Sequence, residues 1–141
     1  MEPNKYKLII ADYSEYPGPR YCIQGDHSGE DFYHTRLNGE FFIALENHMK
    51  LTIELDGTAG FASSFLDEAF GNLVFDFSSD TVKSNIIIIS NQEPDWKEMI
   101  MNNIIPDWES RRKKKETPKK TQEHNEWYRL ENGTLIKKVW D

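Results

Sequence analysis

One stretch organises the chain: Leu51-Thr-Ile-Glu-Leu-Asp56-Gly-Thr-Ala-Gly60-Phe-Ala-Ser63-Ser64-Phe-Leu-Asp-Glu-Ala-Phe70-Gly71. Its first five residues alternate apolar and polar side chains, as in a strand with one buried face, and a glycine-rich loop follows. The next apolar residues recur with a helical period, which predicts a helix over Ser63–Val74. Two serines therefore stand in the first turn of a helix, directly after the carboxyl end of a strand, where backbone N–H groups favour an anion.

Strands and helices alternate on both sides of this stretch, which predicts an α/β fold with one central mixed sheet and helices packed on it. The predicted strands are Tyr6–Ala11, Leu51–Leu55 and Asn85–Ser90. The last of these contains four consecutive isoleucines, as in a central strand that is covered on both faces.

Three helices are predicted, and a long ordered loop precedes the first. The loop spans Asp12–His27 and contains Pro17-Gly18-Pro19. The first helix follows the N-cap Ser28 and continues to about His48, and the second is Ser63–Val74. The third runs from Pro94 to about Arg112, with a kink or an early end expected at Pro106.

The end of the chain differs from the rest in composition. Arg111–Gln122 is charged and has no large apolar residue, whereas Asn132-Gly133 lies between two apolar segments and predicts a β-hairpin. We therefore expect one domain over residues 1–110, a basic linker over 111–123 and a hairpin appendage over 124–141. A lone hairpin is marginally stable in water, so it should pack on the domain or on a partner.

Composition excludes several classes of protein. The chain has 141 residues, enough for one domain, and its longest apolar run is far shorter than the roughly 20 residues of a membrane span. A single cysteine and the lack of an export signal at Met1 suggest the cytoplasm.

The net charge of −7 combines an acidic body with a basic tail that either folds back on the body or contacts an anionic partner. The acidic body and the absence of interleaved aromatics in the tail argue against nucleic-acid recognition, which is kept as a second alternative.

A second candidate site is the loop that carries Arg20, Ser28, Gly29 and Glu30. Arginine and a helix start suit a phosphate or carboxylate, so this loop is a candidate anion site. In the other interpretation, Arg20 pairs with Asp26 or Glu30 and only holds the loop in place. A nucleotide site would need a phosphate-binding lysine or a spaced Gly-x-Gly pattern, and the chain has neither.

The remaining reactive residues form no recognisable pattern. Cys22 and the four histidines lack the spacing of metal ligands, and no nucleophile, base and orienting group can be assembled from the sequence. We therefore expect no metal, no cofactor and no enzymatic activity.

Three blocks of sequence resemble the bacterial STAS-like proteins of undescribed function. They are Tyr16-Pro-Gly-Pro-Arg20-Tyr, then Gly25-Asp-His-Ser28-Gly29-Glu30-Asp-Phe32, then Leu55-Asp56-Gly57-Thr58-Ala-Gly60-Phe-Ala-Ser63-Ser64-Phe65-Leu-Asp-Glu68-Ala-Phe-Gly71. They keep their order and cover roughly residues 6–105. The resemblance implies a STAS-like sandwich, to which the C-terminal hairpin is appended.

The resemblance also implies a function. In the related anti-sigma-factor antagonists, a strand ends in an acidic residue and the second serine of a following Asp-Ser-Ser-Gly motif is phosphorylated by a partner with the histidine-kinase-like ATPase fold. By position, Asp56 matches the strand-end acid and Ser63 and Ser64 match the serine pair, with Ser64 as the phosphoacceptor. This chain has Ala62 in place of the aspartate and Phe65 in place of the glycine.

The expected function is a partner-switching interaction module, with a homodimer also possible. The expected docking residues all lie between the strand end and the first two turns of the helix: Asp56, Gly57, Thr58, Gly60, Phe61, Phe65 and Glu68. The first alternative is a small-ligand or nucleotide-binding protein, or an enzyme, that uses Arg20, Ser28 and Glu30.

Overall fold

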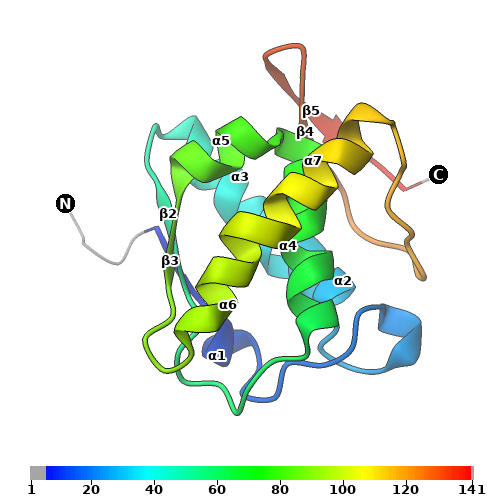
Figure 1. The fold of residues 1–141 in the computed structure, drawn as a ribbon. Coiled ribbons are helices and arrows are strands. Elements are labelled where there is room, and N and C mark those ends of the chain that lie inside the picture. Colours follow the sequence, from blue (N-terminus) through cyan, green and yellow to red (C-terminus); the bar gives the residue numbers. More distant parts are fainter. Residues whose placement is uncertain (1–5, 141) are drawn as a thin grey trace.

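Three parallel strands form the main sheet of the computed structural model, which describes residues 6–140. Their order is β1 (Lys7–Ile9), β2 (Leu51–Glu54) and β3 (Ile86–Ile89), so β2 is the central strand. Leu8, Ile53 and Ile88 are aligned across the sheet, and all three are buried against the helices. In Figure 1 the strands run along one side of the molecule, with α4 and α7 beside them.

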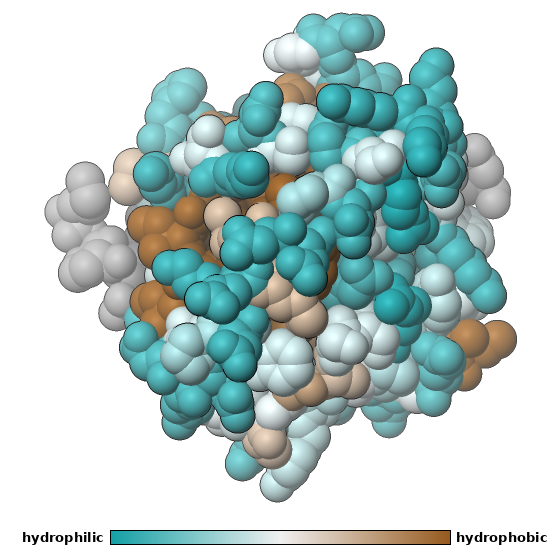
Figure 2. Space-filling view, in the orientation of Figure 1, coloured by the Kyte–Doolittle hydropathy of each residue, from teal (hydrophilic) through white to brown (hydrophobic). Residues whose placement is uncertain are grey.

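Two expectations for this sheet were wrong. The sheet is parallel rather than mixed, and β3 lies at its edge rather than at its centre. The isoleucine run does not have two covered faces, because Ile87 is 46% exposed while Ile86 and Ile88 are buried. Figure 2 shows hydrophobic residues on the side of the molecule where the strands lie.

Two long helical segments each contain one wider, π-helical turn. The first comprises α2 (Gly29–Phe32), η2 (Tyr33–Leu37) and α3 (Asn38–Glu46), and the second α6 (Pro94–Met99), η3 (Ile100–Ile104) and α7 (Ile105–Lys113). The second segment passes through Pro106 and does not end early. In the π-helical turn before the proline, the N–H of Ile105 donates to the carbonyl of Ile100. This shift of the hydrogen bonds by one residue accommodates a residue that has no N–H.

The main core helix is α4 (Ser63–Phe77), which starts where the sequence predicted and ends one turn later. It crosses α7 closely, because a Cβ atom on Gly71 would lie 2.0 Å from the Trp108 ring. Ser78, with a φ of 79°, separates α4 from α5 (Ser79–Asn85), a helix that the sequence analysis missed.

The beginning of the chain also departs from the expectation. The first strand is three residues long, and the chain turns at Ile10 into α1 (Ile10–Tyr13). The expected loop over Asp12–His27 contains the short 3-10 helix η1 (Cys22–Gln24).

The C-terminal hairpin packs on the domain. It consists of β4 (Trp127–Glu131) and β5 (Thr134–Lys138), joined at Asn132-Gly133, where both residues have a positive φ as in a type I′ turn. Tyr128 stacks on Phe42 with ring centroids 3.7 Å apart, and Arg129 binds the buried Asp76 at 2.7 Å.

The basic segment before the hairpin lies against the body. Arg111 lies over the Trp108 ring at 3.7 Å, and Lys120 lies over the Trp127 ring at 4.8 Å. The structure therefore agrees with the alternative in which the basic tail folds back on the acidic body. No helix within residues 6–140 has the length and apolar character needed to cross a membrane.

Candidate functional site

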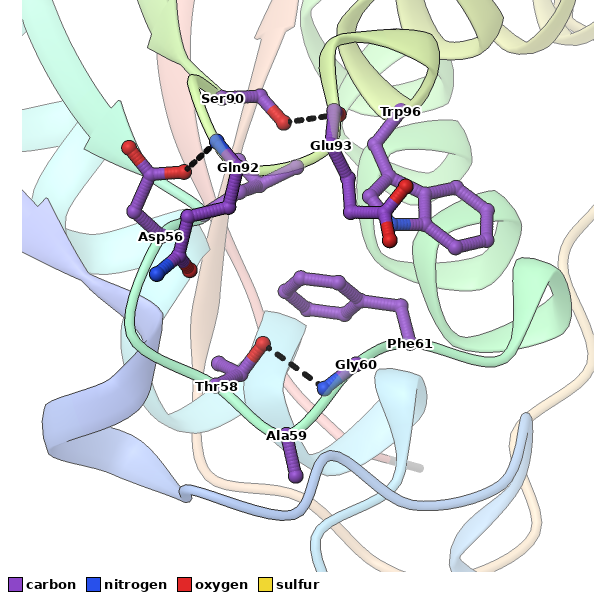
Figure 3. A pocket seen from close by; sticks show the side chains of 10 residues that line it. Asp56, Thr58, Ala59, Gly60, Phe61, Ser90, Gln92, Glu93 and Trp96 are labelled. Carbon is purple, nitrogen blue, oxygen red and sulfur yellow. Dashed lines mark hydrogen bonds between the residues drawn. The ribbon is translucent and has the colours of Figure 1, made fainter.

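A cavity of about 270 Å³ opens at the carboxyl ends of β2 and β3 (Figure 3). One wall is the loop after β2, from Leu55 to Phe61, and the other is the segment from Ser90 to Trp96 after β3. Ligands in open α/β sheets collect at this end of the strands. The cavity therefore lies where the first candidate site was expected, and Asp56, Thr58, Gly60 and Phe61 line it.

Asp56 fastens the two walls together. Its carboxylate accepts hydrogen bonds from the backbone N–H groups of Asn91 at 3.1 Å and Gln92 at 2.9 Å. In return, the N–H of Gly57 donates to the Gln92 side-chain oxygen at 2.9 Å. The strand-end acid is thus a structural brace, and its oxygens point at backbone donors rather than into the cavity.

The cavity has an aromatic lining, and the Glu93 carboxylate lies beside it. The rings of Phe61 and Trp96 lie edge to face, with centroids 6.1 Å apart. Glu93 also lines the cavity, and its side chain is exposed. None of the lining residues is a cysteine, histidine, lysine or arginine; the polar side chains are hydroxyls, carboxylates and one amide. Its chemistry suits an apolar or cationic group.

The two serines stand at the start of α4, just beyond Phe61. Ala62 occupies the N-cap position, so neither serine caps the helix. Ser63 is exposed and Ser64 is half-buried, and within residues 6–140 neither hydroxyl makes an internal hydrogen bond. Ser63 also lines a second groove of about 220 Å³, together with Arg20 and Asp67.

Two of the expected docking residues lie in the core. Phe65 is fully buried and packs on Phe32, with ring centroids 5.6 Å apart. Glu68 is 1% exposed and binds Arg20 and Asn72, and its burial raises its pKa. The accessible part of the expected surface is therefore the loop, including Gly57, together with the exposed Ser63 and the half-buried Ser64.

The loop expected to bind an anion is occupied by the protein's own groups. Arg20 binds Asp67 at 2.5 Å and Glu68 at 3.3 Å, rather than Asp26 or Glu30. The first N–H groups of α2 are also used: Gly29 donates to the Pro19 carbonyl, Glu30 to that of Arg20, and Asp31 to the Ser28 hydroxyl.

Ser28 and Gly29 have no open space around them. Both are buried, and a Cβ atom on Gly29 would lie 2.5 Å from the Phe65 carbonyl oxygen. Gly29 therefore serves the close contact between α2 and α4, and this helix start presents no free donor to a ligand.

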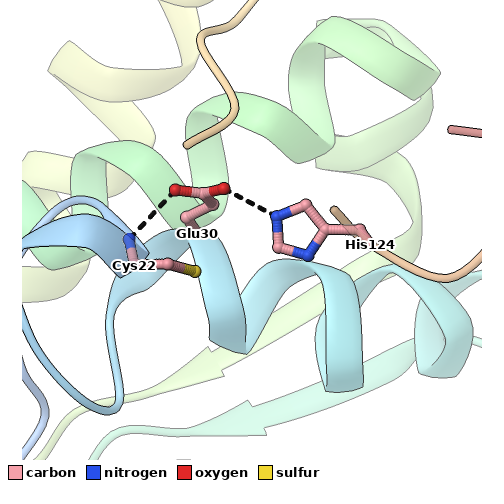
Figure 4. Close-up of side chains that lie close together, drawn as sticks. All are labelled: Cys22, Glu30 and His124. Atoms are coloured by element: carbon pink, nitrogen blue, oxygen red, sulfur yellow. Dashed lines mark hydrogen bonds and ion pairs between the residues drawn. The ribbon is translucent and has the colours of Figure 1, made fainter. Parts of the chain in front are cut away.

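Glu30 instead lies at the centre of a buried junction between distant segments (Figure 4). Its carboxylate accepts hydrogen bonds from the N–H of Cys22 at 3.0 Å, from the N–H of Thr121 at 2.8 Å and from the Thr121 hydroxyl at 2.6 Å. The carboxylate also pairs with His124 Nε2 at 2.6 Å. Burial acts to raise the pKa of Glu30, but the hydrogen bonds from Thr121, His124 and Cys22 outweigh it and lower the pKa to about 2. The sequence analysis missed this junction, because no local pattern connects Glu30 with residues 121–124.

Two further groups at the junction have shifted pKa values. His34 stacks on His124 with ring centroids 3.9 Å apart, and both its ring nitrogens are buried without a hydrogen-bond partner. Burial and the neighbouring His124 lower the pKa of His34 to about 3. Burial raises the pKa of the Cys22 thiol to about 11, so the thiol is protonated and weakly nucleophilic.

A family model matches a segment that includes the cavity walls and the start of α4. No curated protein and no solved structure matches the chain. The matched segment begins at the N-cap of α2 and ends at Trp96 in the cavity wall, which confirms the resemblance stated from the sequence. Residues 28–96 of this chain match the family model described as a STAS-like domain of unknown function (DUF4325).

Proposed function

We propose that this protein is a non-enzymatic interaction module of the cytoplasm that docks a histidine-kinase-like ATPase through the cavity and the start of α4. The observation that carries the proposal is the exposure of this surface. Ser63 and Ser64 present hydroxyls with no internal hydrogen bond, directly after the loop that lines the cavity. Hydroxyl groups that are free of internal partners can be covered or modified by a partner, and this supports a regulated contact.

The cavity indicates the kind of group that the partner inserts. The faces of Phe61 and Trp96, with Glu93 nearby, suit an arginine or lysine side chain. Residues 1–110 carry a strong excess of acidic side chains, which also favours a basic patch on the partner.

Phosphorylation of Ser64 is the proposed control of this contact. A phosphate adds about −1.5 to −2 charge at neutral pH, and the amino terminus of α4 stabilises that charge. The same charge would alter any interface that covers the serine. We therefore expect the phosphorylated form to release the partner.

Co-purification from the native host tests the proposal. Tagged wild-type protein and the Ser64→Ala variant should retain the ATPase, and Ser64→Asp should lose at least tenfold in affinity while melting at the same temperature as wild type. Ser84→Asp is the matched control, since Ser84 is an exposed serine on α5, away from the cavity. Undiminished binding of the ATPase by Ser64→Asp would refute the switch, and phosphate found only on other residues would refute Ser64 as acceptor.

A further inference from the structure

Three side chains with metal-binding atoms meet at the junction, although they come from three separate segments. Cys22 belongs to η1, Glu30 to α2, and His124 to the segment before β4. The thiol sulfur, a carboxylate oxygen and a ring nitrogen of these residues all lie within 4.8 Å of one another (Figure 4). Glu30 and His124 are 1% and 7% exposed, and Cys22 is half-buried.

The separation of these atoms fits a tetrahedral ion. With zinc bonds of about 2.0 Å to nitrogen or oxygen and about 2.3 Å to sulfur, the ligand atoms around a tetrahedral ion lie roughly 3.3–3.8 Å apart. In the protein, the His124–Glu30 contact is 2.6 Å and the longest separation in the cluster stays within 4.8 Å. Metal binding therefore requires the His124 and Glu30 atoms to move apart by about 0.7 Å, with the ion between them.

The kind of ligand also selects the ion. Thiolate and imidazole ligands favour zinc and related transition metals, whereas magnesium and calcium take oxygen ligands almost exclusively. One thiol, one imidazole and one carboxylate therefore indicate Zn²⁺ rather than Mg²⁺ or Ca²⁺.

The surroundings support the three ligands, and one of these residues also lines a cavity. Backbone and hydroxyl donors from Cys22 and Thr121 fix the Glu30 carboxylate, and the stacked His34 ring fixes the plane of His124. Cys22 also lines a separate cavity of about 270 Å³ whose wall includes Asp26 and Asp31. The two carboxylates make that cavity attractive to a cation that approaches Cys22.

We propose that Cys22, Glu30 and His124 bind one Zn²⁺ ion, which fastens the segment before the hairpin to the body of the domain. Binding replaces the S–H bond of Cys22 by a Zn–S bond, and the thiol proton passes to solvent. His124 binds through the lone pair of Nε2 and keeps its proton on Nδ1, in place of the hydrogen bond to Glu30. The expectation of no metal site rested on the spacing of residues in the sequence. Such spacing cannot identify a ligand as distant as His124 from Cys22 and Glu30.

Metal titration of the chelator-treated full chain tests the site. We expect one equivalent of Zn²⁺ to bind with micromolar or tighter affinity and to raise the melting temperature. Co²⁺ in its place should give the intense visible bands of a tetrahedral site and a near-ultraviolet thiolate band. The Cys22→Ser variant should lose the thiolate band and at least tenfold in zinc affinity.

Two further variants separate ligation from folding. His124→Asn should weaken zinc binding at least tenfold, while His48→Asn, at an exposed histidine beyond α3, should bind as wild type does. Circular dichroism of each metal-free variant establishes that it is folded before the titration. Zinc binding by Cys22→Ser that equals wild type, an octahedral Co²⁺ spectrum without a thiolate band, or no binding at micromolar zinc would each overturn the proposal.

Discussion

The cavity at the strand ends and the Glu30 junction both join segments that are distant in the sequence, but they are built in opposite ways. The cavity is formed by two loops that follow neighbouring strands, and most of its loop residues are exposed. Its walls are joined mainly through Asp56 and Gln92. At the junction, one buried carboxylate receives four hydrogen bonds, three of them from residues 91 and 94 positions away in the sequence.

This difference suggests that the cavity loops can change conformation locally, whereas the junction contributes to the stability of the whole domain. Loops with few buried contacts open at low free energy, so the cavity can adjust to a partner without unfolding the domain. A carboxylate removed from water must keep its donors, so the junction opens only when the C-terminal segment leaves the body. We expect changes at the junction to alter global stability, and changes at the cavity to alter local protection and binding.

The largest effect is expected from Glu30→Ala. The change leaves the N–H groups of Cys22 and Thr121 without an acceptor and removes the partner of His124. Losing one member of such a buried group costs about 3–5 kcal/mol in the free energy of unfolding, measured by urea denaturation of metal-free protein. Glu116→Ala, at an exposed glutamate, should stay within about 0.5 kcal/mol of wild type. A loss below about 1 kcal/mol for Glu30→Ala would show that the junction does not hold the domain together.

Acidification should weaken the junction in two stages. The pKa of His34 is lowered from 6.5 to about 3, so between these values the unfolded chain binds a proton that the folded chain does not. Stability therefore falls as the pH drops from about 6.5, with a slope of up to about 1.4 kcal/mol per pH unit. Glu30 adds to the loss below pH 4.5, because its folded pKa of about 2 lies below the unfolded value.

The His34→Phe variant isolates the first stage. Phenylalanine keeps the contact with His124 but cannot be protonated, and the ring nitrogens that it replaces have no hydrogen-bond partner. Urea denaturation at several pH values should show a flat profile between pH 6.5 and 4.5 for the variant and a falling one for wild type. Parallel profiles for the two proteins would assign the acid sensitivity to another group.

The same comparison explains how much the sequence predicts. The strand, loop and helix from Leu51 to Phe77 were placed nearly correctly, because their signals are local periodicities and a glycine-rich loop. The edge position of β3 was missed, since four isoleucines specify an apolar strand but not its neighbours. Helix α5 was missed because its seven residues are mostly polar.

The candidate sites divide in the same way. The cavity could be predicted because parallel strands end at one edge of a sheet, so two successive loops must meet there. The junction could not, because the contact between Glu30 and His124 is fixed by how the C-terminal segment packs and leaves no periodic pattern in the chain. Arg20 shows the same limit, because its partners Asp67 and Glu68 lie on a helix that is distant in the sequence.

The smallest expected effect is that of Asp56→Ala. The change removes the acceptor of the Asn91 and Gln92 amides, which lie at the surface where water replaces it, so the domain should lose only about 0.5–1.5 kcal/mol. Hydrogen exchange should speed up for those two amides and remain unchanged for Thr121, whereas Glu30→Ala should accelerate Thr121 first. Glu98→Gln, at an exposed residue of α6, serves as the control for charge alone. If Asp56→Ala accelerated exchange at Thr121 as well, the cavity and the junction would open as one unit. The cavity loops would then not change conformation independently of the junction.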